Sequence, residues 1–262
     1  MRQLRLDLYI TEKELAGSRE KAKELIKSGN VSVDGNVTEK PAFDVTDENT
    51  IEITGETLKY VGRGGLKLEE AVTRFGLRLD GKVCIDIGAS TGGFTDCMLQ
   101  NGAALVYAVD VGHGQLDSKL LQDRRVISME GSDIRKLTAA DFESPADFIS
   151  ADVSFISLKL ILPKISELLT ESGEAAVLIK PQFEAGRSAI GKNGIVKDRK
   201  AHIRVLEEIV LFCPSAGLSV QGIVPSPIAG GSGNREYLAY LKNGGESSSF
   251  DFKKIVGQAF GD

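Results

Sequence analysis

Four apolar runs of the sequence end on polar residues that can form ion pairs or carry a proton: Asp86, Asp110, Asp152 and Lys180. In an α/β sheet the carboxyl ends of parallel strands meet at one edge, and ligands bind there. Asp152 in DFISADVSFIS and Lys180 in AAVLIKPQFE are therefore expected to lie side by side with opposite charges. The residues alone leave two interpretations open, a structural ion pair and a lysine buried for chemistry.

A glycine-rich turn follows the first of these runs, in VCIDIGASTGGFTD at residues 83–96. Its glycines allow a tight turn and a close approach of the backbone to a ligand, and the following helix offers unpaired N–H groups. The spacing differs from the G-x-G-x-x-G of dinucleotide-binding proteins, which disfavours hydride transfer. Asp110 lies 24 residues after Asp86, where a carboxylate can hold the hydroxyls of a ribose. The pattern predicts a cofactor that carries a nucleoside.

Length and composition limit the class of protein. The chain has 262 residues, 42% of them hydrophobic, which is enough for one large and one small domain. No apolar run approaches the roughly 18 to 20 residues that cross a bilayer, and the N-terminus does not read as a signal peptide, so we expect a cytoplasmic protein. Cys84, Cys97 and Cys213 fit reduced structural cysteines, and with only His113 and His202 we expect no metal site.

The formal net charge of −5 hides two basic segments. Residues 1–30 hold seven Lys or Arg and five Asp or Glu, and a helix is predicted there from an N-cap at Ser18 to about Gly29. Residues 180–204 hold seven Lys or Arg and two Asp or Glu. Either segment can face RNA phosphates, and either can be an ordinary solvated surface.

The order of elements predicts two domains. Short strands near residues 31–33 and 50–53, with a tight Asp34-Gly35 turn, follow the N-terminal helices. A helix ending at Gly76 comes next, and then seven strands are expected near residues 83, 105, 126, 148, 175, 218 and 236. This pattern predicts a doubly wound α/β sheet, mostly parallel with an antiparallel last hairpin. We expect a small α+β domain over residues 1–60, a linker over 61–65 and the α/β domain over 66–262.

Two family resemblances account for these segments. Residues 5–35, RLDLYITEKELAGSREKAKELIKSGNVSVDG, resemble the S4-type RNA-binding domain. In the second domain, four residues match in order and context the Lys-Asp-Lys-Glu tetrad of FtsJ-type ribose 2′-O-methyltransferases: Lys67, Asp152, Lys180 and Glu236. Nearly the whole chain resembles the TlyA branch, which joins these two domains and is often labelled haemolysin.

The resemblance implies a Rossmann-like class I methyltransferase fold with S-adenosylmethionine as cofactor. The glycine-rich turn would hold the methionine moiety, Asp110 the ribose, and Asp133 with Ile134 the adenine. The cofactor-binding residues that it implies are Asp86, Gly88, Ala89, Ser90, Gly92, Gly93, Phe94, Asp110, Asp133 and Ile134.

The resemblance also implies how the reaction would proceed. Lys180 is expected to hold or deprotonate the 2′-hydroxyl and Asp152 to orient it, while Lys67 with Glu236 fixes the ribose. The substrate implied is a cytidine of ribosomal RNA, in the large subunit and as a further candidate in the small subunit, free or within ribosomal subunits. The RNA-binding residues expected are Arg5, Ser18, Arg19, Lys23, Lys27, Arg187, Lys192 and Arg199.

Two other functions compete with this interpretation. One is an RNA-binding ribosome-assembly factor whose methyltransferase fold has lost turnover, although the four tetrad residues speak against it. The other is the pore-forming haemolysin that the label of the TlyA branch suggests. The sequence gives that function little support, since it offers no spanning segment and no amphipathic membrane helix beyond a short tail near residues 250–260.

Overall fold

The computed structural model describes residues 3–13, 15–16, 19–27, 29–53, 59–191, 193–230 and 233–262. The chain divides into two compact units, Met1–Lys59 and Tyr60–Asp262. Each unit has its own hydrophobic core. The two units are therefore described separately.

The small unit packs two helices against short strands. The helices are α1 (Leu6–Glu12) and α2 (Arg19–Lys27), and the strands are β1 (Leu4–Arg5), β2 (Val31–Val33), β3 (Asn36–Val37), β4 (Asp44–Val45) and β5 (Ile51–Ile53). β1 pairs with β4, and β2 is the centre of a three-stranded antiparallel sheet in the order β3-β2-β5. The predicted helix is confirmed as α2. The Asp34-Gly35 turn is confirmed as well, since both of its residues have positive φ (50° and 78°), as a two-residue hairpin requires.

The large unit is built on a seven-stranded sheet in the order β11-β12-β10-β9-β6-β7-β8. The five strands from β10 to β8 in this order run parallel, and β12 lies antiparallel between β10 and β11. The predicted fold class, a mostly parallel doubly wound sheet with an antiparallel last hairpin, is therefore confirmed. The strand bounds are β6 Val83–Ile87, β7 Leu105–Asp110, β8 Val126–Glu130, β9 Ala146–Ala151, β10 Leu169–Ile179, β11 Leu218–Pro225 and β12 Tyr237–Asn243.

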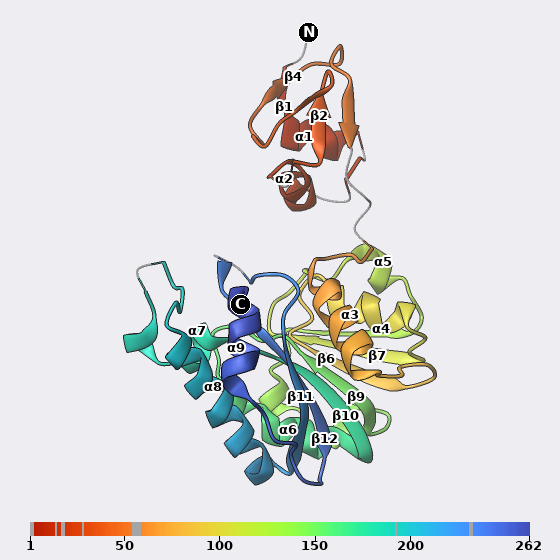
Figure 1. Ribbon diagram of the computed structural model, residues 1–262. Helices are drawn as coiled ribbons and strands as arrows, with labels where there is room; N and C mark the ends of the chain where they lie inside the picture. The colour runs from red at the N-terminus through yellow and green to blue at the C-terminus, as the bar shows by residue number, and fades with distance from the viewer. Residues whose placement is uncertain are drawn as a thin grey trace. The chain divides into compact units, whose positions relative to one another are not determined.

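Helices cover both faces of this sheet (Figure 1). α3 (Gly64–Phe75) and α4 (Gly93–Gln100) lie on one face, and α6 (Leu162–Leu168), α8 (Arg199–Phe212) and α9 (Phe252–Phe260) on the other. The short helices α5 (Ser118–Leu121) and α7 (Pro181–Glu184) lie in the connections. Alternate strand residues supply the two cores, so Ile85 packs on one face while Cys84 packs on the other. α3 ends at Gly76, as predicted, and Gly76 has the left-handed conformation that is common at helix ends.

The segment expected to be a linker, residues 61–65, is instead part of the packed large unit. The Val61 N–H donates to the Asp96 carboxylate at 2.8 Å, and α3 already begins at Gly64. A side chain at Gly93 would place its Cβ 3.1 Å from the Gly62 carbonyl oxygen and 2.9 Å from the Gly65 nitrogen. The expectation failed because glycine-rich sequence suggests flexibility, whereas these glycines allow two backbone segments to touch.

Candidate active site

The two central parallel strands, β6 and β9, meet where the strand order reverses, and the candidate site lies at their carboxyl ends. The Asp152 N–H donates to the Ile87 carbonyl at 2.9 Å. Gly88 has φ +83°, and a Cβ there would lie 2.7 Å from the Asp152 carbonyl oxygen, so only glycine fits. A cavity of about 240 Å³ opens above this contact, lined by Gly64, Gly88, Ala89, Ser90, Thr91, Gly93, Phe94, Asp152, Ser154 and Lys180.

Asp110 closes the glycine-rich turn from the neighbouring strand. Its carboxylate accepts hydrogen bonds from the backbone N–H groups of Ser90 at 2.8 Å and Gly112 at 2.7 Å. The Ser132 N–H donates to the Asp110 carbonyl at 2.9 Å, which brings the 131–134 turn beside it. A carboxylate has about four lone-pair positions, so Asp110 can still accept from two ribose hydroxyls.

The turn at residues 131–134 presents backbone to the site more than side chains. The Asp133 carboxylate is held by Arg135, and this hydrogen bond lowers the pKa of Asp133 to about 2. The Ile134 side chain is buried in the core. The contact of Ser132 with Asp110 thus brings this turn to the site, but neither the Asp133 nor the Ile134 side chain lines the cavity above Gly88.

Asp86 lies beneath the turn rather than in the cavity. It is fully buried and accepts hydrogen bonds from the Thr95 hydroxyl at 2.7 Å and the Ser150 hydroxyl at 3.0 Å. Burial raises the pKa of Asp86 to about 7, although these hydrogen bonds favour its charged form. Its position indicates that it supports the turn, with no direct path to a ligand in the cavity.

The four tetrad residues converge from four elements into one network. Lys67 lies in the first turn of α3, Asp152 follows β9, Lys180 follows β10, and Glu236 precedes β12. Lys180 Nζ lies 2.5 Å from Asp152 Oδ1, Lys67 Nζ lies 3.5 Å from Asp152 Oδ2, and Lys67 Nζ donates to Glu236 Oε2 at 2.7 Å. Both lysine side chains are only 9% exposed. Two cations and two anions therefore balance in a poorly solvated cluster, which is the arrangement that a buried charge requires.

An exposed aromatic residue beside the tetrad was missed by the sequence analysis. Phe155 is 92% exposed, has φ +63° and packs against Phe183 with ring centroids 5.1 Å apart. Glu184 holds this loop in place, because it accepts from the Ser157 hydroxyl at 2.6 Å and the Leu158 N–H at 2.7 Å. The sequence DVSFIS did not single out this residue, because the neighbours Ser154 and Ile156 are as compatible with a buried aromatic side chain as with an exposed one.

Two further polar side chains that the sequence analysis missed contact the tetrad. Lys180 Nζ donates to Ser154 Oγ at 3.0 Å. Gln182 Nε2 donates to Glu236 Oε1 at 3.1 Å. The short helix α7 therefore takes part in both features: Gln182 contacts Glu236 of the tetrad, and the next residue, Phe183, packs against Phe155.

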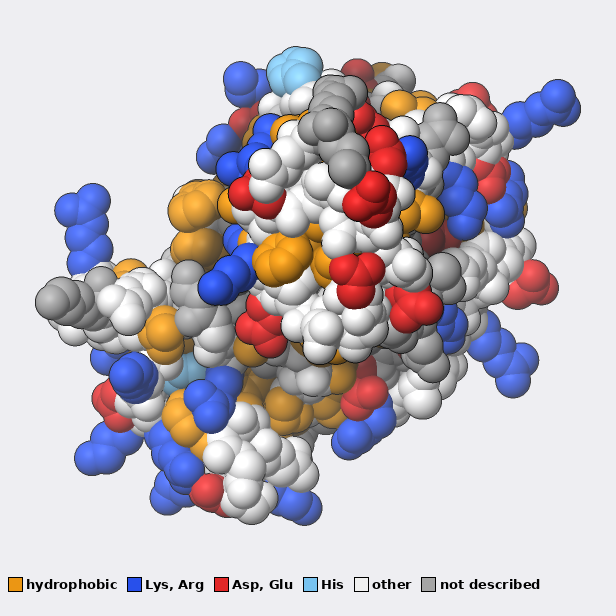
Figure 2. All heavy atoms as spheres, turned by 90° about the horizontal axis from the view of Figure 1, so that it is seen from above, with side chains coloured by type: hydrophobic (Ala, Val, Ile, Leu, Met, Phe, Trp, Pro, Cys, Tyr) orange, Lys and Arg blue, Asp and Glu red, His pale blue; other side chains and the backbone are white. Residues whose placement is uncertain are grey.

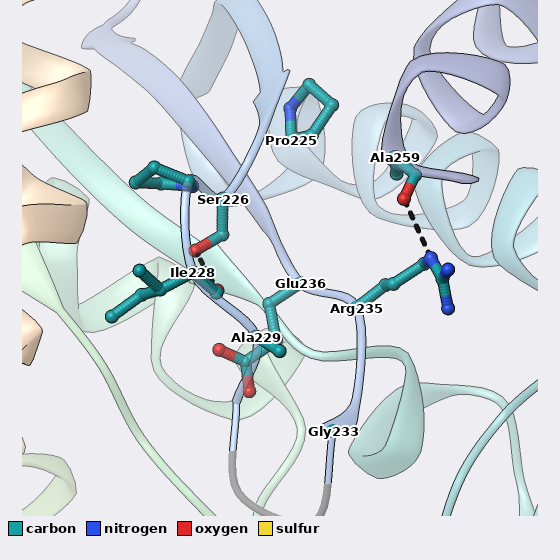
Figure 3. Close-up of a pocket in the computed structure, with 9 residues that line it drawn as sticks. Pro225, Ser226, Ile228, Ala229, Gly233, Arg235, Glu236 and Ala259 are labelled. Carbon is teal, nitrogen blue, oxygen red and sulfur yellow. Dashed lines mark hydrogen bonds between the residues drawn. The ribbon is translucent and has the colours of Figure 1, made fainter. Parts of the chain in front are cut away.

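A second cavity of about 310 Å³ lies on the far side of Glu236, between the β11–β12 connection and the end of α9. Figure 3 shows Glu236 and Arg235 pointing away from each other at the start of β12. Arg235 Nε donates to the Ala259 carbonyl at 2.7 Å, and its guanidinium lies 4.1 Å from the Phe260 ring centroid. This contact anchors the C-terminal helix beside the tetrad.

The basic residues of the small unit are organised by one buried carboxylate. Asp7 is fully buried, and its oxygens accept from Arg5 Nε at 2.9 Å and Arg19 Nε at 3.0 Å. Burial would raise the pKa of Asp7, but the two guanidinium groups hold that pKa below its usual value. Lys23 and Lys27 lie further along α2. Ser18 lies outside the described residues.

The basic residues of the large unit that were expected to bind RNA differ in whether other side chains hold them in place. Figure 2 shows Lys and Arg side chains projecting from the left side of the molecule, where α7 and α8 lie in Figure 1. Arg187 is exposed in the connection between these helices. Arg199 is held by Asp262, with Nη2 donating to Oδ1 at 2.9 Å, and lies 4.8 Å from the Phe260 ring centroid. Lys192 lies outside the described residues.

The described part of the chain offers neither a membrane span nor a metal cluster. No described helix is long and apolar enough to cross a membrane. Among the same residues, no group of three or more His, Cys, Asp or Glu side chains is placed to hold a metal ion. His202 is a core residue, hydrogen-bonded to the Tyr237 hydroxyl at 2.8 Å and the Val196 carbonyl at 2.9 Å, and His113 is exposed.

Comparison with known proteins matches both units to families. The FtsJ-like methyltransferase family matches residues 60–243, and the S4 domain matches residues 4–51. YqxC of Bacillus subtilis, a candidate rRNA methyltransferase, is 48% identical over 92% of this chain and 86% of its own length. The 16S/23S rRNA (cytidine-2′-O)-methyltransferase TlyA of Mycobacterium tuberculosis is 38% identical over 92% of this chain and 90% of its own. A solved haemolysin-like protein from Streptococcus thermophilus is 47% identical, with a TM-score of 0.81 over 99% of this chain and 96% of its own.

Proposed function

The chain belongs to the FtsJ-like methyltransferase family, and on this premise we propose that it transfers the methyl group of S-adenosylmethionine to the ribose 2′-oxygen of a cytidine in ribosomal RNA. The observation that carries the proposal is the network of Lys67, Asp152, Lys180 and Glu236 beside the glycine-rich turn. The S4 domain and the named activity of the TlyA relative support RNA as the substrate class.

The residues around the turn fit S-adenosylmethionine. Because Gly88 has no side chain, its backbone packs closely on Asp152 and leaves room above the strand ends. Asp110 offers carboxylate oxygens where a ribose diol is expected. The 131–134 turn lies beside Asp110 for the adenine. The bound cofactor supplies an electrophilic sulfonium methyl group, so the protein needs to align the acceptor hydroxyl and manage one proton.

Lys180 is the residue placed to hold that proton. Its Nζ lies at the cavity wall between the Asp152 carboxylate and the Ser154 hydroxyl, which fix its direction. Lys67 is held by Glu236 on one side and Asp152 on the other, so it can fix the ribose while its charge stays balanced. Positioned proton transfer of this kind contributes about 10²- to 10⁴-fold in rate.

Phe155 supports a single-stranded nucleotide as the acceptor. A large aromatic side chain left 92% exposed beside Lys180 offers a stacking face for an unpaired base. Contact with Phe183 and the Glu184 hydrogen bonds hold the loop that carries it. A base stacked there would bring its ribose to the tetrad.

RNA outside the acceptor nucleotide would contact the basic residues of both units. We assign phosphate contacts to Arg5, Arg19, Lys23, Lys27 and Arg187, which sit on α2, beside it, or on the connection after α7. Arg199 can contact a phosphate only with the part of its guanidinium group that is not bound to Asp262. Phosphate contacts of this kind position the protein on RNA and carry no sequence information themselves.

The test is transfer of radiolabelled methyl from S-adenosylmethionine to unmodified ribosomal subunits and to free ribosomal RNA. The wild-type protein should label a cytidine 2′-oxygen, and Lys180→Ala should lose about 10²- to 10⁴-fold while binding the cofactor normally. Lys242→Ala removes an exposed lysine from β12, six residues after Glu236, and is the matched control.

Each other outcome has a definite meaning. Near-normal turnover by Lys180→Ala would show that the assigned role of Lys180 is wrong. Cofactor binding by the wild type without label on any RNA would favour the RNA-binding assembly factor. Leakage of liposomes treated with the purified protein would favour the haemolysin.

A further inference from the structure

Glu236 is held by two donors from different elements. Lys67 Nζ donates to Oε2 at 2.7 Å, and Gln182 Nε2 donates to Oε1 at 3.1 Å. The Glu236 side chain is only 2% exposed, so water does not replace either contact. On the Oε1 side, a Cβ at Gly230 would lie 2.1 Å from that oxygen, which means that the loop backbone packs directly against the carboxylate. Gln182 is therefore the side-chain donor that fixes this half of the carboxylate.

The chemistry of the pair fixes the orientation of the Gln182 amide. An ionised carboxylate only accepts hydrogen bonds, so the amide NH₂ must face Glu236 and the amide oxygen must point away. That oxygen is buried and has no hydrogen-bond partner. A buried unpaired amide oxygen destabilises the fold, and an apolar side chain of similar size would avoid it. The hydrogen bond that the NH₂ group donates to Glu236 therefore explains the amide side chain at position 182 better than packing does.

The charges around Glu236 explain why the donor is neutral. The charged groups facing it are Lys67 from α3, Asp152 after β9 and Lys180 after β10, and they balance Glu236 two against two. Arg235 points to α9 and does not enter this cluster (Figure 3). A third cation or a third anion at position 182 would upset the balance in a poorly solvated site. A glutamine adds a hydrogen bond without adding a charge.

We propose that Gln182 is a positioning residue for methyl transfer: it holds Glu236, and through it Lys67, in the geometry that fixes the acceptor ribose. This inference rests on the proposed function. Lys180 is the N-cap of α7 and Gln182 is the second residue of this helix, so one short segment carries both the proton-holding lysine and the group that orients the opposite end of the network.

The test compares Gln182→Leu and Gln182→Glu with the wild type in the methyl-transfer assay. Gln182→Leu should lower kcat about 10- to 100-fold, by analogy with the loss that follows removal of a group that orients a metal-binding side chain. Cofactor affinity and the KM for RNA should stay within about threefold, because Gln182 contacts neither the turn nor a phosphate-binding residue. Gln100→Leu is the matched control, since the Gln100 amide donates to the Asp96 carboxylate at 3.0 Å outside the tetrad.

Gln182→Glu supplies a readout that a purely structural residue would not move. At acidic pH the new carboxyl group keeps a proton and can donate it to Glu236, which imitates the amide. As the pH rises this proton leaves, and two carboxylates then repel each other at hydrogen-bonding distance. The variant should therefore lose both kcat and thermal stability with rising pH, relative to the wild type over the same range.

The outcomes separate this inference from the proposed function. Gln182→Leu with kcat within twofold of an active wild type, or Gln182→Glu with an unchanged pH profile, would overturn the role of Gln182 alone. A wild-type protein that methylates no RNA would overturn the proposed function and this role together. In that case the pH-dependent stability of Gln182→Glu would still report whether the contact with Glu236 exists.

Discussion

Replacing Asp86 by asparagine should change how the stability of the large unit depends on pH. Asp86 is fully buried, and burial raises its pKa from an ordinary 3.8 to about 7. Between these values the folded protein keeps a proton that the unfolded chain has released, so the free energy of unfolding falls as the pH rises. At about 1.4 kcal/mol per pH unit, the full loss is about 4 kcal/mol between pH 4 and pH 7. An asparagine side chain at this position stays neutral and escapes this loss.

The assay is chemical unfolding followed by circular dichroism at several pH values from 4.5 to 7.5, with the transition of the large unit fitted separately from that of the small unit. Carboxyl groups whose pKa is lowered, such as Asp133 and Glu174, add stability with rising pH mainly below their ordinary pKa values of 3.8 and 4.5, so they contribute little change over this range. They are common to both proteins, so the difference between Asp86→Asn and wild type removes them. Asp80→Asn, at an exposed aspartate before the same strand, is the control.

The difference in unfolding free energy should shift in favour of Asp86→Asn by several kcal/mol as the pH rises from 4.5 to 7.5. A difference that stays constant within about 0.5 kcal/mol, the scatter expected of an ordinary surface substitution, would refute the reasoning. It would mean that the hydrogen bonds from Thr95 and Ser150 stabilise the charged form enough to cancel the desolvation.

Three further substitutions test other parts of the structure. Gly88→Ala should lower the free energy of unfolding by about 1–3 kcal/mol and weaken cofactor binding, because Gly88 has a positive φ and a Cβ there would clash with the Asp152 carbonyl oxygen. An unchanged melting temperature together with an unchanged affinity for S-adenosylmethionine in calorimetry would contradict this. Phe155→Ala should reduce kcat/KM on RNA about 5- to 150-fold, the equivalent of one lost base stack, at unchanged melting temperature; full activity would rule out stacking. Asp7→Asn should destabilise the small unit by about 1–3 kcal/mol and weaken RNA binding, since its two half-exposed arginine partners lose their common anchor; identical unfolding curves and RNA affinity would show that the anchor is dispensable.

Local patterns in the sequence were enough to predict the elements and the residues at their ends. Apolar runs predicted all seven strands of the large sheet, because strands buried on both faces read as continuous hydrophobic segments. Since the carboxyl ends of parallel strands share one edge, the same runs predicted that Asp152 and Lys180 would be neighbours. Helix α3 and its end at Gly76 followed from periodicity and from the need for a residue that tolerates positive φ.

Contacts that depend on packing between distant elements came only from the tertiary structure. Asp86 and Asp110 look alike in sequence as aspartates at the ends of strands, yet one is sealed beneath the turn and the other faces it. The exposure of Phe155 and the contact of Gln182 with Glu236 could not be predicted from the sequence either. Each depends on how α7 packs against a loop from a distant part of the chain. Strands and helices are specified by nearby residues, whereas burial, pairing and the environment of each charge are set by segments far apart in the chain. Local sequence therefore specifies which elements form and what kind of chemistry their ends can carry, and packing between distant segments selects the side chains that reach the site.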